Sequence, residues 1–408
     1  MRVPGLSAAA AVLLLAPSAA LAATLRVGPS ETHTTIQSAV AAAIDGDVIL
    51  VDEGSFPENV IIAGFDGLTI RGRGTGTVLL PEGTGIHIQS CAAVTITNLA
   101  VSPSGGTGIL VENSTGILLS RLTVTVGSPA IYLDSTGFVT ISRCRFDDGS
   151  SGIVDDASTD LLIEKCVFNT IGGTAVFLSP YNVKGGASDR ARVSKCLIDG
   201  ASTGIHCGGD DVVIEKNDIT SSGFAGIHFD STSQPEGAVL AKNDVSGGQY
   251  GLYATLDRST LSKNYFGVSL ETEVYLDGDE NLVEKNETDG GNRGFQVVGS
   301  GNTLSKNLAE GTVIGFQVLG GPGIVLSKNA VERPSSVGFW VQANGSQVLS
   351  NRVTGAGDFG FRIDSTGNTI TRNSASDSAT YDLYSLFPEG DNTYDRNRFE
   401  TTFFGTGP

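Results

Sequence analysis

The chain has 408 residues and a formal net charge of −18, with only 17% charged residues and 54 glycines. So acidic a protein excludes nucleic acid as a general partner, because phosphate contacts need a basic surface. Five cysteines are too few for a disulfide framework in a chain of this size. The abundance of glycine, together with Val, Ile, Thr, Asn and Asp, favours many short strands joined by tight turns.

The first 22 residues have the pattern of a secretory signal peptide. Arg2 precedes an apolar run at residues 9–16, and Ala20-Leu21-Ala22 forms an A-x-A cleavage site. This run is too short to cross a bilayer. We therefore expect residues 1–22 to be removed and the protein to be secreted or periplasmic, with no membrane insertion.

Residues 23–64 are predicted to cap one end of the fold. The stretch TIQSAVAAAI predicts a helix, because Ile36, Val40 and Ile44 fall on one helical face. The sequence VILV at 48–51 then predicts a buried strand.

The rest of the chain repeats with a period of about 22 residues. The tetrapeptide LSKN ends at Asn264, Asn307 and Asn329, and IEKN, LAKN and VEKN are near copies. Each copy is followed by a stretch with apolar residues at alternate positions, which is typical of a strand with one buried face. A unit this short leaves no room for a crossover helix. We therefore predict an all-β parallel β-helix of about fourteen coils over residues 65–399, with a tail at 400–408.

The last residue of the tetrapeptide defines a column that repeats from coil to coil. An inward Asn can bond to the Asn above and below it, so the column predicts a buried asparagine ladder. In this alignment the column holds Asn98, Arg121, Cys144, Cys166, Cys196, Asn217, Asn243, Asn264, Asn286, Asn307, Asn329, Asn351, Asn373 and Asn397. The three cysteines are expected to be small buried substitutes, and the sequence leaves open whether Cys144 and Cys166 form a disulfide.

The residue before this column is nearly always basic, and alternation places it outside. Its members are Arg143, Lys165, Lys195, Lys216, Lys242, Lys263, Lys285, Lys306, Lys328, Arg372 and Arg396. Two interpretations stay open. The charges discourage association between sheet edges, or they form a track for a polyanion such as a uronate polymer.

A second outward column is rich in aromatic side chains. Tyr132, Phe177, Tyr253, Tyr275 and Trp340 are predicted to bind sugar rings, because contiguous exposed aromatic stripes mark binding surfaces. The alternative is cross-strand stacking that only stabilises the sheet.

The middle of this column carries the predicted catalytic residues. Insertions at 179–189 and 230–238 lengthen the same turn beside it, and loops on a rigid scaffold often carry function. A histidine can act as general base, and paired carboxylates can act on a glycosidic bond. The predicted catalytic residues are His206, His228, Asp230, Asp210 and Arg190, and Tyr181 and Lys184 of the first insertion are predicted to bind substrate.

Two stretches carry a resemblance to a known family. TTIQSAVAAAIDGDVILVDEGSFPENVII resembles the N-terminal cap of secreted right-handed parallel β-helix proteins of the pectin-lyase-like superfamily. The later coils resemble the NosD/CASH-type β-helix repeats of that superfamily. The resemblance implies a right-handed parallel β-helix. The catalytic motifs of pectin methylesterases, polygalacturonases and alginate epimerases are absent, so no family residue carries over.

Two functional hypotheses follow. The first is an exported protein that binds a uronate-type or other acidic glycan along the aromatic, histidine and carboxylate face, and cleaves it as a lyase or hydrolase if it is an enzyme. Ca²⁺ is the cofactor that lyase chemistry would use. The second is a non-catalytic surface, adhesion or NosD-like periplasmic accessory protein. The sequence does not indicate a metal site or an oligomeric state.

Overall fold

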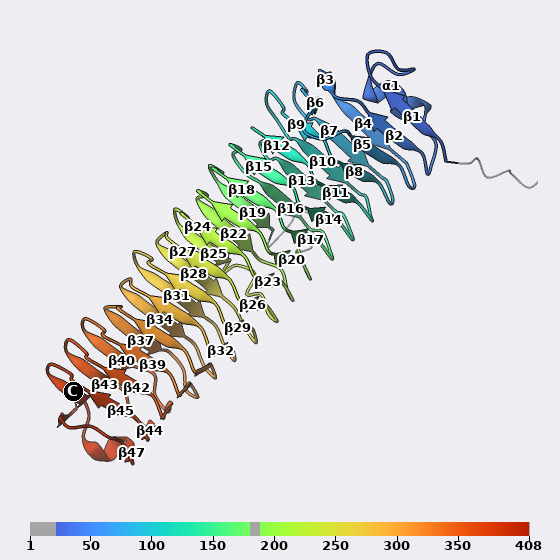
Figure 1. Ribbon diagram of the computed structural model, residues 1–408. Coiled ribbons are helices and arrows are strands. Elements are labelled where there is room, and N and C mark those ends of the chain that lie inside the picture. Colours follow the sequence, from blue (N-terminus) through green and yellow to red (C-terminus); the bar gives the residue numbers. More distant parts are fainter. Residues whose placement is uncertain (1–21, 180–187, 408) are drawn as a thin grey trace, which may run out of the picture.

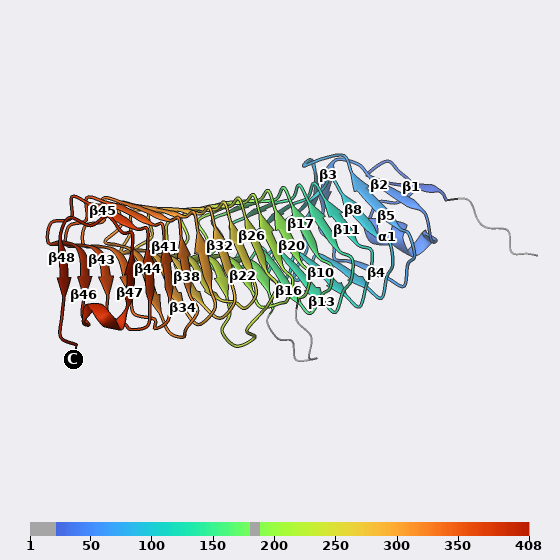
Figure 2. The same ribbon diagram turned by 90° about the horizontal axis from the view of Figure 1, so that it is seen from below.

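A computed structural model describes residues 22–179 and 188–407. The chain winds into a right-handed parallel β-helix of about 17 turns, with three parallel sheets along its length. Figures 1 and 2 show the resulting rod, with the α-helix at the N-terminal end. Between the two ends of the rod, each turn adds one strand to sheet A, then one to sheet B and one to sheet C. The fold class predicted from the sequence is confirmed.

Sheet A contains 17 strands. They are β1 (Thr24–Val27), β2 (Val48–Val51), β5 (Thr69–Gly72), β8 (Thr95–Thr97), β11 (Leu118–Ser120), β14 (Thr140–Ser142), β17 (Leu162–Glu164), β20 (Arg192–Ser194), β23 (Val213–Glu215), β26 (Val239–Ala241), β29 (Thr260–Ser262), β32 (Leu282–Glu284), β35 (Thr303–Ser305), β38 (Val325–Ser327), β41 (Gln347–Leu349), β44 (Thr369–Thr371) and β47 (Thr393–Asp395).

Sheet B contains 15 strands. They are β3 (Gly54–Phe56), β6 (Thr77–Leu79), β9 (Ala100–Val101), β12 (Thr123–Thr125), β15 (Arg145–Asp147), β18 (Val167–Asn169), β21 (Leu197–Asp199), β24 (Asp218–Thr220), β27 (Asp244–Ser246), β30 (Tyr265–Gly267), β33 (Glu287–Asp289), β36 (Leu308–Glu310), β39 (Ala330–Glu332), β42 (Arg352–Thr354) and β45 (Ser374–Ser376).

Sheet C contains 16 strands. They are β4 (Val60–Ala63), β7 (Ile86–Gln89), β10 (Ile109–Glu112), β13 (Ile131–Asp134), β16 (Ile153–Asp156), β19 (Thr174–Leu178), β22 (Thr203–Cys207), β25 (Ala225–Phe229), β28 (Tyr250–Thr255), β31 (Thr272–Asp277), β34 (Arg293–Val298), β37 (Ile314–Leu319), β40 (Val337–Val341), β43 (Phe359–Ile363), β46 (Tyr381–Ser385) and β48 (Thr402–Phe404).

The N-terminal end differs from the prediction in detail. Helix α1 (Ile36–Ala42) is capped by Thr35, whose hydroxyl accepts the N–H of Ser38 at 3.2 Å. The Glu58 carboxylate accepts two further N–H groups of the first turn, at 2.7 and 2.9 Å. Ile44 lies beyond the helix and is 45% exposed, so its predicted place on the buried face is wrong.

The count of fourteen coils is too low. Strands β1, β2, β3 and β4 already belong to the three sheets, although their turns carry none of the asparagine or basic signals used to count coils. A further strand, β48, lies within the predicted tail at 400–408 and pairs with β46. A short 3-10 helix, η1 (Glu389–Asp391), precedes β47.

The asparagine ladder is present from Asn217 to Asn397. The Asn307 side chain shows its pattern: Oδ1 accepts the N–H and Nδ2–H of Asn286 at 2.8 and 3.1 Å, while Nδ2 donates to Val283 O and Asn329 Oδ1. Each Asn therefore satisfies buried groups in both neighbouring coils. Shorter ladders at the turn from sheet C to sheet A, Asn281 to Asn302 and Asn368 to Asn392, were not predicted.

Two residues of the predicted column are out of register. Strand pairing aligns Thr97, Ser120 and Ser142, so Asn98 and Arg121 occupy the same turn position as Arg143. Leu99 and Leu122 take the inward position instead and are buried. The residue type Asn therefore does not by itself mark the inward position, which is set by the strand register.

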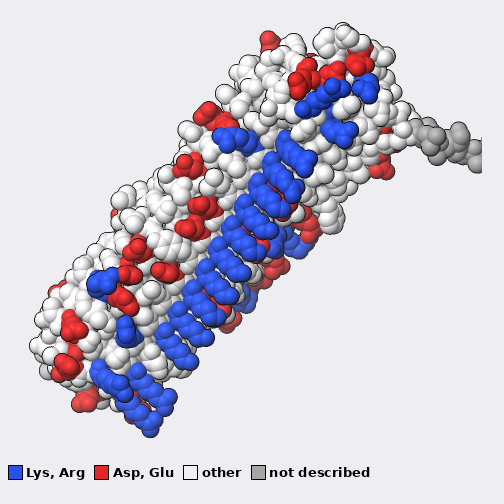
Figure 3. Space-filling view, in the orientation of Figure 1, with Lys and Arg blue, Asp and Glu red and all other residues white. Residues whose placement is uncertain are grey.

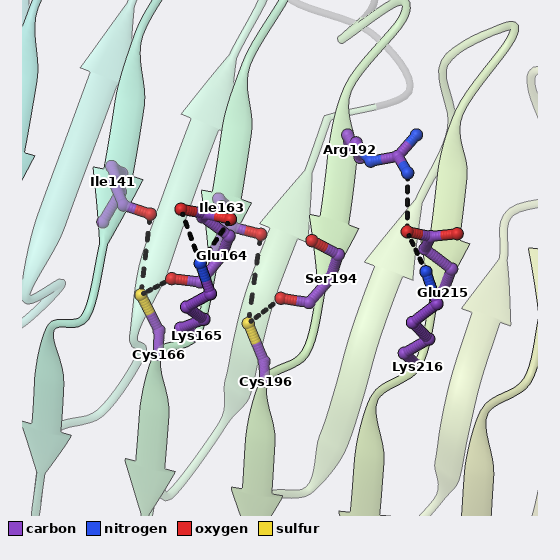
Figure 4. Close-up of polar contacts among 10 residues, drawn as sticks. All are labelled: Ile141, Ile163, Glu164, Lys165, Cys166, Arg192, Ser194, Cys196, Glu215 and Lys216. Atoms are coloured by element: carbon purple, nitrogen blue, oxygen red, sulfur yellow. Dashed lines mark hydrogen bonds and ion pairs between the residues drawn. The ribbon is translucent and has the colours of Figure 1, made fainter.

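All five cysteines are buried free thiols. Cys144, Cys166 and Cys196 lie in the ladder column, in line with Asn217. Figure 4 shows the Cys166 thiol directed at the carbonyl oxygens of Ile141 and Glu164, at 3.6 and 3.5 Å. The structure thus contains no Cys144–Cys166 disulfide, and the three thiols fill space that the ladder amides fill elsewhere.

Candidate functional site

The predicted glycan-binding face is an outward column of sheet C, which we call the aromatic row. Strand pairing places Phe177, His206, His228, Tyr253 and Tyr275 side by side in five successive coils. All five side chains are half-buried. The structure therefore brings the central part of the predicted face together.

The rings of the aromatic row largely cover one another. His206 and His228 stack with ring centroids 4.3 Å apart, and Tyr253 and Tyr275 stack at 4.8 Å with an interplanar angle of 9°. The rings of Phe177 and His206 lie edge to face, with an interplanar angle of 89°. Stacking along the axis leaves ring edges and hydroxyls toward solvent, whereas a sugar ring packs best on an open ring face.

Two predicted binding residues lie apart from this cluster. Tyr132 is separated from Phe177 by Val154 and donates its hydroxyl to Asp156 at 3.3 Å. Trp340 lies three coils beyond Tyr275; its Nε1 donates to Asp364 at 2.8 Å, and the Arg362 guanidinium sits 4.5 Å from its ring centroid. These carboxylate and guanidinium partners could not be assigned from sequence spacing.

His206, His228 and Asp230 form the predicted catalytic centre. His206 Nε2 lies 3.5 Å from Asp230 Oδ2. Desolvation lowers the pKa of His206, and desolvation with the neighbouring His206 lowers the pKa of His228 to about 4. Burial works against the charge of Asp230, but hydrogen bonds from the hydroxyl and the N–H of Thr232, together with the electrostatic effect of the two histidines, lower its pKa overall. At neutral pH the group is thus two neutral imidazoles beside one carboxylate.

Asp210 and Arg190 are engaged elsewhere. Both lie in the turn from sheet C to sheet A. Arg190 forms two hydrogen bonds to Asp160, at 2.9 and 3.0 Å, and Asp210 accepts the N–H of Glu236 at 2.9 Å. Neither makes a hydrogen bond or ion pair with the histidines among the described residues. Tyr181 and Lys184 lie outside the described residues.

The second predicted surface is the outward basic column, which we call the cationic ridge. It lies at the turn from sheet A to sheet B and holds a basic residue in ten successive coils. The residues are Arg121, Arg143, Lys165, Lys195, Lys216, Lys242, Lys263, Lys285, Lys306 and Lys328. All ten are exposed, and Figure 3 shows the row running along the molecule. Arg121 is the member that the sequence alignment missed.

Each ridge residue has a left-handed backbone conformation, with φ between 52° and 58°. For a residue with a Cβ this conformation costs about 1–2 kcal/mol, and glycine or asparagine suits it better. Because neighbouring strands lie about 4.8 Å apart, the ridge presents one cation at about that interval. The sequence thus places long basic side chains where backbone geometry alone would favour smaller residues.

Few ridge charges are neutralised. Lys165, Lys216 and Lys285 pair with the glutamate just before each, at 3.3, 3.1 and 3.4 Å (Figure 4 shows the first two). Lys216 and Arg192 together lower the pKa of Glu215 although partial burial opposes this. The other seven cations form no ion pair within residues 22–179 and 188–407. Such exposed pairs contribute little stability.

The ridge does not protect a sheet edge. The N–H of Lys285 donates to Ser305 O and that of Lys306 to Ser327 O, both at 3.0 Å, so the backbone here is paired to the next coil. Open edges occur only at the ends of a solenoid. Edge protection, one of the two interpretations of the basic column, therefore does not account for cations along its side.

No group of three or more His, Cys, Asp or Glu side chains in the described part of the chain is arranged to hold a metal ion. Within the same residues, no helix combines the length and apolar character that a membrane crossing requires.

Two family models match the chain. "Right handed beta helix region" matches residues 59–207, and "Periplasmic copper-binding protein (NosD)" matches residues 232–404. With the three parallel sheets, these matches settle the fold. The chain is a right-handed parallel β-helix protein. No curated protein matches its sequence.

Several solved structures resemble this β-helix protein. They include the catalytic unit of a GH87 α-1,3-glucanase from Streptomyces thermodiastaticus (12% identity, 91% of this chain and 66% of that one, TM-score 0.39). Others are PfbA, a surface adhesin of Streptococcus pneumoniae (11%, 81% and 87%, 0.42), and the PL6 polysaccharide lyase Pedsa3628 from Pseudopedobacter saltans (14%, 90% and 90%, 0.40). At these identities and TM-scores, the likenesses do not bear on the activity of the chain.

Proposed function

We propose that the protein is an exported β-helix protein that binds a linear acidic polysaccharide along the cationic ridge. The observation that carries this proposal is the ridge itself: ten exposed cations in successive coils, each in a left-handed backbone conformation. The sequence assigned glycan binding to the aromatic row. The ridge supports it better, because the rings of the row already cover one another.

The ridge needs a counter-charge from outside the protein. Neighbouring cations at about 4.8 Å repel each other, and seven of the ten have no carboxylate partner in the described structure. A net charge of −18 shows that solubility did not require these cations. A polyanion lying along the ridge would remove the repulsion in every coil at once.

A narrow, evenly charged chain fits the ridge better than a duplex or a membrane. The ridge is one residue wide, and carboxylates flank it at Glu164, Glu215 and Glu284 on one side and at Asp218 and Asp244 on the other. A broad anionic surface would meet these carboxylates as well as the cations. A uronate polymer carries one carboxylate per sugar ring, so its charge repeat resembles the coil repeat.

Binding to polygalacturonate, measured by isothermal titration calorimetry, tests the proposal. Replacing Lys242, Lys263, Lys306 and Lys328 by Gln should weaken binding by at least 30-fold, at about 0.5–1 kcal/mol per exposed charge. The matched control replaces four cations off the ridge, Arg73, Arg190, Arg258 and Arg333, and should leave affinity within about threefold. Equal losses in both variants, or equal wild-type binding to a neutral glucan, would contradict the proposal.

A second candidate function is cleavage of an acidic polysaccharide at the aromatic row on sheet C, a surface separate from the ridge. The observation that favours it is the neutral His206 beside the ionised Asp230, which suits proton abstraction by the imidazole. Incubation with polygalacturonate, with and without Ca²⁺, tests it through unsaturated-product absorbance and reducing ends. Turnover that His206→Gln abolishes would support it, whereas no turnover under either condition leaves binding as the function.

A further inference from the structure

A separate cluster of arginines lies where the basic column reaches the C-terminal end. Ser350 interrupts the column after Lys328, and Arg372 and Arg396 resume it in the same left-handed conformation, with φ of 57° and 50°. Beside them, strand register places Arg352, Ser374 and Arg398 at equivalent outward positions of three successive coils. Two basic columns thus end side by side.

The chain path creates a hollow at this place. Sheet B stops at β45, one turn before sheets A and C, which continue to β47 and β48. In the described structure, sheet B continues beyond β45 only as the bridge between Ser374 and Arg398. The next residue, Phe399, packs against Phe361, with their ring centroids 5.3 Å apart. The missing strand leaves the outer edge of β45 partly uncovered.

Two adjoining cavities occupy the hollow. One, of about 340 Å³, is lined by Arg372, Ser374, Arg396 and Arg398. The other, of about 410 Å³, shares Ser374 and Arg398 with it and extends over β45 to Arg352 and Glu400. Three arginines and one serine therefore line the smaller cavity, and no Asp or Glu is among its lining residues.

Nearby acids leave this cavity cationic. Arg396 lies 3.6 Å from Asp395, and Arg352 pairs with Glu332 at 3.3 Å. Both arginines and Asp395 are largely exposed, and only Glu332 is partly buried, so these pairs are screened by solvent. Arg372 and Arg398 have no ion pair with any described residue. Guanidinium groups bind carboxylates through two parallel hydrogen bonds, which the point charge of lysine cannot do. Arginines thus surround the cavity, whereas lysines predominate on the ridge.

We infer that the Arg372, Ser374, Arg396 and Arg398 cavity binds the carboxylate of an acidic sugar at one end of the polysaccharide. This inference rests on the proposed function and deepens it. The ridge supplies affinity that grows with polymer length, because each coil adds one similar cation. The cavity recognises a single sugar and so fixes the end and the direction of the chain. Ser350 separates the two by one coil without a charge.

Trigalacturonate tests the inference, because a trimer is too short to span most of the ridge. Replacing Arg372 and Arg398 by Gln should weaken trimer binding at least tenfold and polymer binding only a few-fold. The matched control, Lys242→Gln with Lys263→Gln, removes the same charge and should weaken polymer binding about fivefold or more. It should leave trimer binding within about twofold. A neutral trisaccharide should not bind at the same concentration.

The outcomes separate this inference from the proposed function. Polymer binding without detectable trimer binding would overturn the cavity assignment and leave the ridge. Equal loss of trimer binding in both double variants would also overturn it. A third outcome would support the cavity and contradict the ridge. In it, only the arginine variant loses trimer binding, and the wild type binds the polymer no more tightly than the trimer.

Discussion

The aromatic row and the cationic ridge are both columns of like side chains repeated coil after coil, yet the stacking has opposite consequences. In the row, Tyr253 and Tyr275 stack at 4.8 Å, so each ring stabilises its neighbour. On the ridge, neighbouring Lys and Arg side chains repel each other, and seven of the ten form no ion pair with a residue that the structure describes. The stacked rings stabilise one another without a ligand, whereas the proposed polyanion would offset the repulsion between the ridge cations.

The largest expected effect is on stability, and it distinguishes the buried asparagine ladder from the exposed cationic ridge beside it. Asn307→Ala leaves two buried donors of Asn286 without an acceptor and should lower the free energy of unfolding by about 2–5 kcal/mol. The adjacent Lys306→Gln should change it by less than about 0.5 kcal/mol, because Lys306 is exposed. Urea unfolding measures both. Comparable losses of unfolding free energy in the two variants would show that the ridge cations also stabilise the β-helix.

The aromatic row should prove structural. Tyr253→Ala removes a ring that stacks on Tyr275 and contacts His228, and we expect a loss of about 1–3 kcal/mol in unfolding free energy. Affinity for polygalacturonate should stay within twofold, and Trp340→Ala should behave likewise. Loss of binding at unchanged stability in either variant would return the binding surface to the row.

The pH dependence of stability provides a smaller effect in the same row. The pKa of His228 is lowered from 6.5 to about 4, so below pH 6.5 the unfolded chain binds more protons than the folded one. The folded state should therefore lose stability as the pH falls from about 6.5 to 4. His228→Phe keeps a stacking ring and should flatten this part of the profile in thermal melts. An unchanged profile would show that this histidine is not held neutral.

The smallest expected effect is a gain in affinity for polygalacturonate. Ser350 occupies a ridge position with φ of 58°, like the basic residues on either side, so arginine fits there without new strain. Ser350→Arg should strengthen polygalacturonate binding about twofold to fivefold, the contribution of one exposed charge. Unchanged affinity would show that the polymer does not pass this coil.

Much of the fold was predictable because the repeat is written in the sequence. A period near 22 residues and the Lys-Asn pair gave the parallel β-helix, the ladder and the outward basic column. The first turns were not predicted because strands β1 to β4 pair although their turns contain no Lys-Asn pair and do not follow the repeat. Asn98 and Arg121 were misplaced because only strand register shows which residue takes the left-handed position.

The site was less predictable, since it depends on geometry that spacing does not encode. Periodicity placed His206, His228 and Tyr253 in one row but could not show that ring faces cover one another. It could not show that Arg190 is held by Asp160. The arginine cavity exists because sheet B ends a turn early, which depends on where the chain leaves the sheet.

The salt dependence of polygalacturonate binding tests the central claim most directly. Cations that contact a polyanion release its counterions, so each lost contact reduces the slope of log K against log salt concentration. The variant lacking Lys242, Lys263, Lys306 and Lys328 should show a slope smaller in magnitude by about 2–3 than the wild type. The off-ridge variant lacking Arg73, Arg190, Arg258 and Arg333 should keep the wild-type slope. Equal slopes in the wild type and the ridge variant would contradict the assignment of the ridge as the polyanion-binding surface.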